Sequence, residues 1–334
     1  MNGKMRIYNT DLIIDEIINP DNKEIVIITH IRPDGDTIGS AYGLKYAIED
    51  RFTDKIVTVL CAEEIKDRLR FIFGDDTPLI TLDELSHDLI IAVDSAEPVL
   101  MGENAKFAET EKINIKIDHH VNGSCYADIN YIDDKASSCG EIIFDICKKL
   151  GKITAKTALP LYAAICSDTG NFRFRNVTAM THRITAELID TGIDQADISR
   201  KLYGMKTQKE LISQRLALNN LRYYNGGSIA VTMITNEMKT KNAITDDDLG
   251  DINSITLDIQ GVELGITIKQ FDDKPEKFRV SMRSGENVDA SVICVKLGGG
   301  GHIRASGALV EADDPVSAEK IIVDTAISVI GEIV

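Results

Sequence analysis

Four apolar segments in the first half of the chain are each followed closely by side chains that can hold a metal ion. The clusters are His30, Asp34 and Asp36 after Glu24–Thr29; Asp94 after Leu89–Val93; Asp118, His119 and His120 after Ile113–Ile117; and Asp168 after Leu161–Cys166. Because ligands bind beyond the carboxyl ends of parallel strands, this repeated order predicts that the clusters meet in one crevice. This repeated placement of ligand-type residues after apolar segments favours an α/β domain with its active site at one edge of the sheet.

The segments around these clusters alternate between strand and helix patterns. We predict strands at Glu24–Thr29, Lys55–Cys61, Leu89–Val93 and Ile113–Ile117, and helices at Thr37–Arg51, Ser138–Leu150, Ala155–Cys166 and Thr181–Asp190. Ser138 and Glu141 have the spacing of a helix-capping box, and Gly151 is a natural stop. Strands that alternate with helices indicate a parallel sheet sandwiched by helices.

The length of 334 residues suits two domains. We predict a catalytic domain at residues 1–190, a helical linker at 191–227 with a long helix at Thr207–Tyr224, and a smaller α/β domain at 228–334. In the smaller domain the predicted strands are Ser228–Thr235, Val262–Phe271, Phe278–Arg283 and Gly307–Glu311, and the predicted helices are Asp246–Ile259, Val288–Leu297 and Pro315–Val329.

The bulk properties exclude several classes of protein. With 37 Lys and Arg against 53 Asp and Glu, the net charge of −16 argues against coating long duplex DNA, although a few local cations would suffice for a small phosphorylated substrate. No stretch approaches the roughly 18–20 apolar residues of a membrane span, and the N-terminus lacks the features of a signal peptide. The six cysteines are scattered without a C-x-x-C pair, so we expect a reducing cytoplasmic location.

The residue types in the predicted crevice are those of a divalent metal site. Converging carboxylates would repel one another, and metal ions remove that conflict. Imidazole with carboxylate, and without thiolate, suits Mn²⁺, Fe²⁺, Co²⁺ or Mg²⁺ better than structural zinc. A single Asp after a strand is more often a turn residue or a helix cap, but four clusters in order favour function. Two ions about 3.5–4 Å apart could activate water and stabilise the leaving oxygen of a phosphate ester.

The second domain carries a glycine run, Gly298–Gly301, followed by His302. Such a run exposes backbone N–H groups and lets a phosphate approach closely, although a bare run is more often a flexible helix terminus. His302 and the separate Arg283 favour phosphate binding, because an arginine can grip a phosphate through two parallel hydrogen bonds. Phe172 suits base stacking and core packing equally well.

Together these motifs resemble the DHH phosphoesterase superfamily, with a second domain of the DHHA1 type. The matching segments are Thr29–Asp36, Val93–Ser95, Asp118–His120, Ser167–Phe172, Ser281–Ser284 and Gly298–Gly307. They occur in the order expected of that family and span nearly the whole chain. The length and the two-domain layout resemble its stand-alone nanoRNase and pAp-phosphatase subgroup.

The resemblance implies two divalent metal ions, in the first place Mn²⁺. One would be held by His30, Asp34 and Asp94, and the other by Asp36, Asp94, His119 and Asp168, with Asp94 bridging. A hydroxide between the ions would attack phosphorus, His120 would stabilise the phosphate charge or help the leaving group, and Asp118 would orient the histidines. The substrate would lie in the cleft between the domains, with binding residues Arg283, Ser284, Gly299, Gly300, Gly301 and His302.

The implied activity is hydrolysis of short oligoribonucleotides to mononucleotides, with removal of the 3′-phosphate of pAp as a second activity. The same residues could act on pApA or cyclic di-AMP, and a homodimer stays open. The run Gly298–His302 disfavours a family II inorganic pyrophosphatase, the chain length disfavours the single-strand DNA exonuclease RecJ, and the missing spans disfavour membrane-bound cyclic-dinucleotide phosphodiesterases. A nucleotide sensor without turnover would be expected to lack a ligand, and none is missing.

Overall fold

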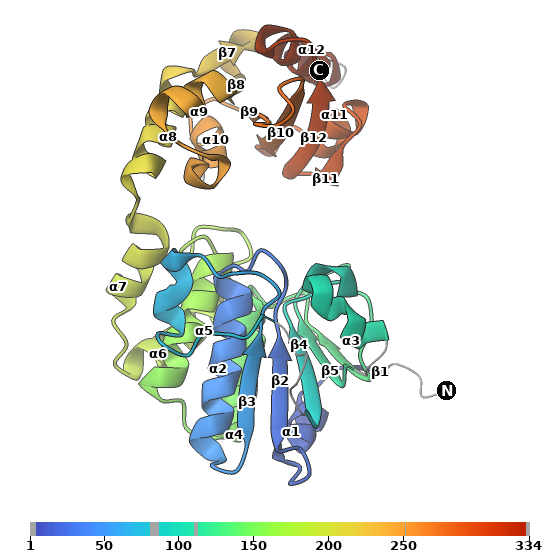
Figure 1. Cartoon of the computed structure of the whole chain (residues 1–334), viewed down its shortest axis with the longest axis vertical. Helices are drawn as coiled ribbons and strands as arrows, with labels where there is room; N and C mark the ends of the chain where they lie inside the picture. Colours follow the sequence, from blue (N-terminus) through green and yellow to red (C-terminus); the bar gives the residue numbers. More distant parts are fainter. Residues whose placement is uncertain (1–4, 81–86, 110–112, 251, 332–334) are drawn as a thin grey trace. The chain divides into compact units, whose positions relative to one another are not determined.

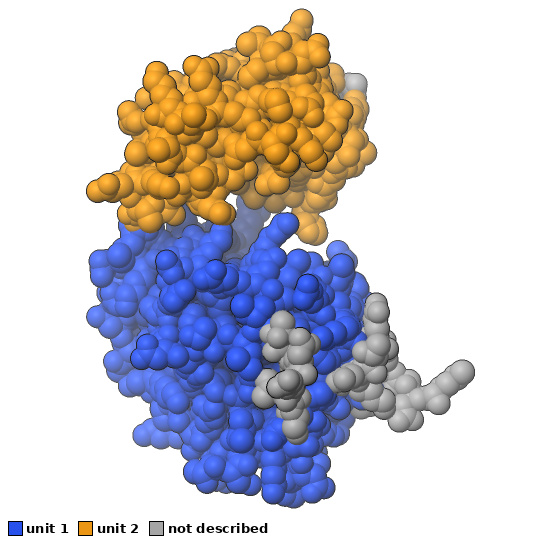
Figure 2. All heavy atoms as spheres, in the orientation of Figure 1, with its two compact units in different colours: residues 1–205 blue, residues 206–334 orange. Residues whose placement is uncertain are grey.

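The chain forms two compact units, residues 1–205 and 206–334 (Figure 2). The computed structural model describes residues 5–80, 87–109, 113–250 and 252–331. It confirms the predicted fold class, a parallel-sheet domain followed by a smaller α/β domain (Figure 1). The division between the units falls inside the segment for which the sequence predicted a linker, 191–227. Within the described ranges, no helix combines the length and the apolarity that crossing a membrane requires.

The first unit is built on a six-stranded sheet in which every neighbouring pair is parallel. In sheet order the strands are β1 (Met5–Ile7), β6 (Ile129–Ile132), β5 (Ile115–Asp118), β4 (Leu89–Val93), β2 (Glu24–Ile28) and β3 (Ile56–Leu60). Strand β4 is buried at every position, as a central strand covered on both faces should be. The sequence analysis missed β1 and β6, because three or four residues make too short a pattern to recognise.

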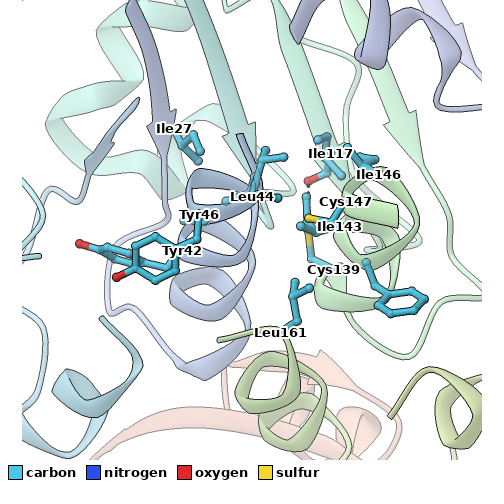
Figure 3. Close-up of a cluster of buried hydrophobic side chains, with 14 of the residues drawn as sticks. Ile27, Tyr42, Leu44, Tyr46, Ile117, Cys139, Ile143, Ile146, Cys147 and Leu161 are labelled. Atoms are coloured by element: carbon cyan, nitrogen blue, oxygen red, sulfur yellow. Dashed lines mark hydrogen bonds between the residues drawn. The ribbon is translucent and has the colours of Figure 1, made fainter. Parts of the chain in front are cut away.

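Helices cover both faces of this sheet, which confirms the predicted sandwich. They are α1 (Asp11–Ile18), α2 (Gly35–Arg51), η1 (Asp67–Ile72), η2 (Pro98–Ala105), α3 (Lys106–Glu109), α4 (Cys139–Leu150), α5 (Ala155–Asp168), α6 (Ala179–Asp190), α7 (Gln195–Ser199) and η3 (Arg200–Gly204). Because successive strand residues point to opposite faces, Ile27 joins the core under α2, α4 and α5 (Figure 3), whereas Ile28 joins a second core with Met101 and Phe107.

Helices α2 and α5 approach each other closely at Gly39. A Cβ atom at this position would overlap the carbonyl oxygen of Pro160 and lie 2.8 Å from the Cβ of Ala164. One turn further along α2, Gly43 leaves room for the side chain of Leu161, which belongs to the core drawn in Figure 3. The contact between the two helices therefore requires glycine, although glycine weakens an isolated helix.

The second unit contains a mixed six-stranded sheet. In sheet order the strands are β11 (Gly300–His302), β12 (Ala305–Glu311), β10 (Lys277–Ser284), β9 (Leu264–Gln270), β8 (Ile229–Ile234) and β7 (Arg222–Tyr224). Strands β8 and β9 run parallel, and the other neighbouring pairs run antiparallel. The helical segments are α8 (Gln208–Asn219), η4 (Asn225–Gly227), α9 (Asn236–Asn242), η5 (Asp246–Leu249), α10 (Asn253–Leu257), α11 (Ala290–Lys296) and α12 (Pro315–Gly331).

Three elements of the second half differ from the sequence predictions. The long helix predicted at Thr207–Tyr224 ends at Asn219, and its last residues form β7, because they pair with β8. The helix predicted at Asp246–Ile259 is interrupted near Gly250, which has a positive φ of 53°. Gly300, Gly301 and His302 form strand β11, which the sequence analysis did not predict, because they pair with β12. In each case strand pairing or a glycine turn, which the local sequence pattern did not reveal, determines the observed structure.

We predict that Gly39→Ala destabilises the protein. Helix propensity alone would make this change favourable by about 1 kcal/mol, but the overlap with Pro160 should reverse the sign and cost about 1–3 kcal/mol. Denaturant unfolding followed by circular dichroism measures the difference. Gly331→Ala in α12 is the matched control, since a Cβ atom there meets no atom within 4 Å, and it should be neutral or slightly stabilising. Equal effects of the two changes would contradict the tight packing of α2 on α5.

Candidate metal centre

The first cluster lies where β2 leads into α2. His30 follows the strand, Asp34 is the N-cap of the helix, and Asp36 lies in its first turn. The Oδ1 atom of Asp34 accepts hydrogen bonds from the backbone N–H groups of Asp36 at 3.0 Å and Thr37 at 3.1 Å. Asp34 therefore caps the helix, the ordinary role of such a residue, and its position at the helix start still places it beside His30.

Asp94 lies at the centre of the site and has an unusual backbone. Its φ is +54°, a left-handed conformation that non-glycine residues rarely adopt and that concentrates at functional positions. The side chain is only 3% exposed, and its buried Oδ1 atom has no hydrogen-bond partner. The two carboxylate oxygens lie 3.4 Å from Nε2 of His30 and 3.5 Å from Nε2 of His119. A buried carboxylate oxygen without a donor is expected where a cation binds.

Two sets of donor atoms that share no residue lie around Asp94: His30, Asp34 and Asp94, and Asp36, His119 and Asp168. A third set, Asp94, His119 and His120, overlaps both. Nε2 of His119 lies 3.7 Å from Asp36 and 3.3 Å from Asp168, and Nε2 of His30 lies 3.7 Å from Asp34. Atoms that are each about 2.1–2.3 Å from a shared ion lie about 3–4 Å apart at bond angles of about 90–120°, so these spacings fit metal ligands. The structure thus brings together all six residues that the sequence indicated as ligands.

Asp36 is held in place by the start of helix α4. Its carboxylate accepts hydrogen bonds from the backbone N–H groups of Cys139 at 2.7 Å and Gly140 at 2.9 Å, and from the hydroxyl of Ser40. The N-cap Ser138 accepts a hydrogen bond from the N–H of Glu141, but the second half of the predicted capping box does not form, because the Glu141 carboxylate accepts from Ser137 instead. The N–H groups of a helix start favour a nearby anion, so α4 orients a carboxylate that is fully buried. The sequence analysis missed this contact, because only the fold brings α4 to Asp36.

The raised pKa values of His30, His119 and Asp168 indicate that the buried carboxylates favour a nearby positive charge. Burial opposes protonation of His30, but Asp34 and Asp94 outweigh it and raise the pKa of His30 to about 11. Burial likewise opposes protonation of His119, and Asp94, Asp36 and Asp168 raise its pKa to about 10. Burial and the neighbouring Asp94 raise the pKa of Asp168 to about 6 despite the opposing effect of His119. A metal ion would supply this charge and displace the protons.

Asp118 and His120 form a linked pair beside these ligands. Oδ1 of the fully buried Asp118 accepts hydrogen bonds from Nδ1 of His120 at 2.7 Å and from the backbone N–H groups of His119 and His120. Burial tends to raise the pKa of Asp118, but His120 and Lys116 hold it below its usual value. The His120 side chain is 47% exposed. These contacts support the expectation that Asp118 orients a histidine.

Asp168 is placed differently from the sequence prediction. It is the last residue of α5 rather than a residue beyond the helix, and the chain then turns through Gly170, Asn171 and Phe172, which all have positive φ. The ring of Phe172 packs between Tyr162 and His182, so the packing role fits this residue better than base stacking.

In the second unit, Arg283 and His302 lie in one row of the sheet. Each is directly paired with Ala305, Arg283 from β10 and His302 from β11. Residues paired in this way point to the same face, and two strand spacings put their backbones about 10 Å apart. His302 is exposed and Arg283 is half-buried. The pair could bind a phosphate group on this face.

The other candidate residues of the second unit contribute to packing. The hydroxyl of the buried Ser284 donates to the carbonyl of Ile303 at 3.0 Å. A Cβ atom at Gly299 would overlap the carbonyl oxygen of Gly307, and one at Gly301 would lie 2.7 Å from the Cα of Ser306. Gly300 has open space instead. The glycines therefore let β11 lie close to β12, which positions His302.

Comparisons with known proteins agree with this arrangement. Residues 24–165 match the DHH family N-terminal domain, and residues 226–332 match the DHHA1 domain. The crystal structure of an exopolyphosphatase-related protein from Bacteroides fragilis shares the fold with a TM-score of 0.86, although only 24% of residues are identical; the match covers 97% of this chain and 96% of that one.

Several relatives match over most of this chain. The bifunctional oligoribonuclease and PAP phosphatase NrnA of Thermus thermophilus is 28% identical over 92% of this chain and 91% of its own length. The probable bifunctional oligoribonuclease and PAP phosphatase NrnA of Streptococcus mutans is 31% identical over 85% of this chain and 88% of its own length. The cyclic-di-AMP phosphodiesterase PdeA of Listeria monocytogenes is 26% identical over 89% of this chain and 46% of its own length.

We predict that Asp94→Asn weakens metal binding more than any other single ligand change, because Asp94 contacts both sets of donors. Asparagine tolerates the left-handed backbone, so the change removes charge without adding backbone strain. Calorimetric titration with Mn²⁺ should show an affinity at least about tenfold lower, and the metal-free variant should be at least as stable as the wild type. Asp134→Asn is the control for an exposed carboxylate. Unchanged Mn²⁺ binding by Asp94→Asn would refute the central position of Asp94.

Proposed function

We propose that this chain, which belongs to the DHH/DHHA1 phosphoesterase family, hydrolyses short oligoribonucleotides to mononucleotides and removes the 3′-phosphate of pAp. The observation that carries this proposal is the pair of donor sets around Asp94. Many enzymes that cleave phosphate esters use two adjacent metal ions, which stabilise the attacking and the leaving oxygen. The relatives of the chain from Thermus thermophilus and Streptococcus mutans bear both activities in their names.

We infer that the site holds two divalent ions and that Mn²⁺ suits it best. The donors are imidazole nitrogens and carboxylate oxygens without thiolate, a set that suits Mn²⁺ better than structural zinc. When bound, such ions would supply a hydroxide near neutral pH and stabilise the charge of the leaving oxygen. His30, Asp34 and Asp94 would hold one ion, and Asp36, Asp94, His119 and Asp168 would hold the other.

The residues around the ligands would orient the reacting groups. Nδ1 of His120 is engaged by Asp118, so Nε2 is the ring nitrogen left for the substrate, where it can stabilise a phosphate oxygen or assist the leaving group. In the second unit, Arg283 and His302 would bind a phosphate of the substrate from one face of the sheet. A small number of local cations of this kind is compatible with the net charge of −16.

A second candidate function is hydrolysis of cyclic di-AMP or of its linear form, pApA. The observation that favours it is the similarity to the cyclic-di-AMP phosphodiesterase of Listeria monocytogenes, which extends over 89% of this chain. This chain spans only 46% of that relative, however, whereas it spans 91% of the relative from Thermus thermophilus. The oligoribonuclease proposal therefore has the better support.

We also infer a reducing, cytoplasmic location. Five of the six cysteines are buried free thiols, and the sixth, Cys125, is an exposed free thiol. Burial raises the pKa of Cys147 and Cys166, which makes these thiols unreactive packing residues.

We predict a strong preference for the shortest substrates. Metal-stripped protein supplied with Mn²⁺ should release mononucleotides quickly from labelled ribo-oligomers of two, three and five nucleotides, and leave an oligomer of twenty-four nearly untouched. It should also release phosphate from pAp, and a chelator should abolish both activities. Cyclic di-AMP, pApA and pyrophosphate serve as parallel substrates. Turnover of cyclic di-AMP or pyrophosphate alone would overturn the proposal, as would binding without turnover.

We predict that Arg283→Ala raises KM for a short oligomer at least about tenfold and changes kcat little, because a charge-assisted pair of hydrogen bonds to phosphate would be lost. Arg279→Ala is the matched control. Arg279 lies on the same strand and the same face, but its guanidinium lies over the ring of Phe271. A fall in kcat with KM unchanged would instead assign Arg283 to the transition state.

A further inference from the structure

A buried lysine lies beneath the Asp118-His119-His120 segment. Lys116 on β5 is completely inaccessible to solvent. Its Nζ atom donates hydrogen bonds to the carbonyl oxygens of Ala96 and Ser124, both at 2.9 Å, and forms an ion pair with Oδ2 of Asp118 at 3.1 Å. Two of the three N–H bonds of the ammonium are thus donated to carbonyls, and its charge compensates the carboxylate of Asp118, whose Oδ2 accepts no hydrogen bond.

The three partners of Lys116 come from three segments of the site. Ala96 lies two residues after Asp94, Asp118 ends β5, and Ser124 lies in the loop that follows His120. The two loops are joined further by a hydrogen bond from the N–H of Ser124 to the carbonyl of Ala96 at 3.0 Å. One buried cation therefore connects the loop that carries Asp94 to the loop that follows the histidines.

The surroundings of Lys116 leave little room for another arrangement. A Cβ atom at Gly123 would lie 2.8 Å from Nζ of Lys116 and 2.7 Å from Oδ2 of Asp118, so this glycine makes space for the ion pair. On another side, Nζ lies 4.8 Å from the centre of the Tyr126 ring, whose hydroxyl donates to the carbonyl of Ser95. Packing and charge together fix the position of Nζ.

The carboxylate of Asp118 divides its two oxygens between two tasks. Oδ1 accepts the hydrogen bond from Nδ1 of His120, and Oδ2 faces Lys116. Oδ1 also accepts hydrogen bonds from the backbone N–H groups of His119 and His120, so the backbone holds one oxygen and Lys116 attracts the other. The ion pair with Lys116 therefore opposes rotation about the Cβ–Cγ bond and helps to keep Oδ1 directed at His120.

We propose that Lys116 is a positioning residue for the phosphoesterase reaction, which acts through Asp118 to hold the ring of His120 against the substrate. The inference rests on the proposed function, since it assumes that His120 assists hydrolysis. Lys116 does not touch the substrate in this proposal. The alternative is that Lys116 has a purely structural role. Its loss would then lower stability and metal binding, but the effect on kcat would not depend on His120.

The first test is a double-mutant cycle between Lys116→Met and His120→Ala. In the wild-type background, Lys116→Met should lower kcat on a dinucleotide at least about tenfold, with KM and bound Mn²⁺ nearly unchanged. In the His120→Ala background the same change should lower kcat less than about twofold, because the ring through which Lys116 acts is gone. An equal loss of kcat in both backgrounds would overturn the proposal.

A matched control comes from the second unit. Lys239 is also buried, and its Nζ contacts a carbonyl of Gln270 and the carboxylates of Asp246 and Asp272. Lys239→Met should lower the midpoint of thermal unfolding without the selective effect on kcat. If Lys116→Met does not fold, Lys116→Gln replaces it in the same cycle, because its amide can still donate to one or two of the three oxygens.

The second test does not depend on activity. The ¹⁵N signals of the His120 ring, measured by NMR in the metal-free protein, should show hydrogen-bonded Nδ1–H in the wild type and a mixture of ring states in Lys116→Met. Lys239→Met should leave these signals in place. If the wild type cleaved no phosphate ester, the proposed function would fail, while the ring signals would still decide whether Lys116 governs His120. Unchanged signals in Lys116→Met would refute the positioning role.

Discussion

The structure of the first unit depends on concentrating buried negative charge at the carboxyl edge of one parallel sheet. Asp36, Asp94 and Asp118 are almost fully buried there, and each has a different means of support. The N–H groups of helix α4 hold Asp36, and Lys116 and two backbone N–H groups hold Asp118. Oδ1 of Asp94 and Oδ2 of Asp118 are both buried without a hydrogen-bond donor, but Oδ2 of Asp118 has the charge of Lys116 beside it. The protein therefore compensates the outer carboxylates itself and leaves the central one to a cation from outside.

Close packing between helices sets the distances in this site. Helix α2 begins beside Asp36, and helix α5 ends at Asp168, so the approach of these two helices fixes how near the two carboxylates come. The approach is close at Gly35, where a Cβ atom would lie 2.7 Å from the Cβ of Ser167, and closer still at Gly39, where it would overlap the carbonyl oxygen of Pro160. Two glycines on α2 thus affect the chemistry indirectly, because a wider helix pair would separate ligands of one ion.

The sequence predicted the fold and the six candidate ligands because both depend on local patterns. A buried parallel strand is a continuous apolar run, and the ligands follow such runs directly, as Asp94 follows β4. What it could not show depends on contacts between distant segments, such as helix α4 on Asp36 or the packing of Phe172 against His182. Lys116 was overlooked for a related reason: in the alternating apolar and polar pattern of residues 113–118 it looks like a solvent-facing residue until its partners are known.

The sequence suggested two roles for the glycine run of the second unit, a helix terminus and a phosphate-binding loop. Gly298 ends the turn after α11 with a φ of +77°, so part of the run is a helix terminus. The next residues form β11, the last strand on one side of its sheet as far as the chain is described. One edge of β11 pairs with β12, and no other strand of the described chain pairs with its second edge. Packing thus explains why glycines are needed at Gly299 and Gly301, where a Cβ atom would overlap β12, while anion binding by this segment stays a proposal.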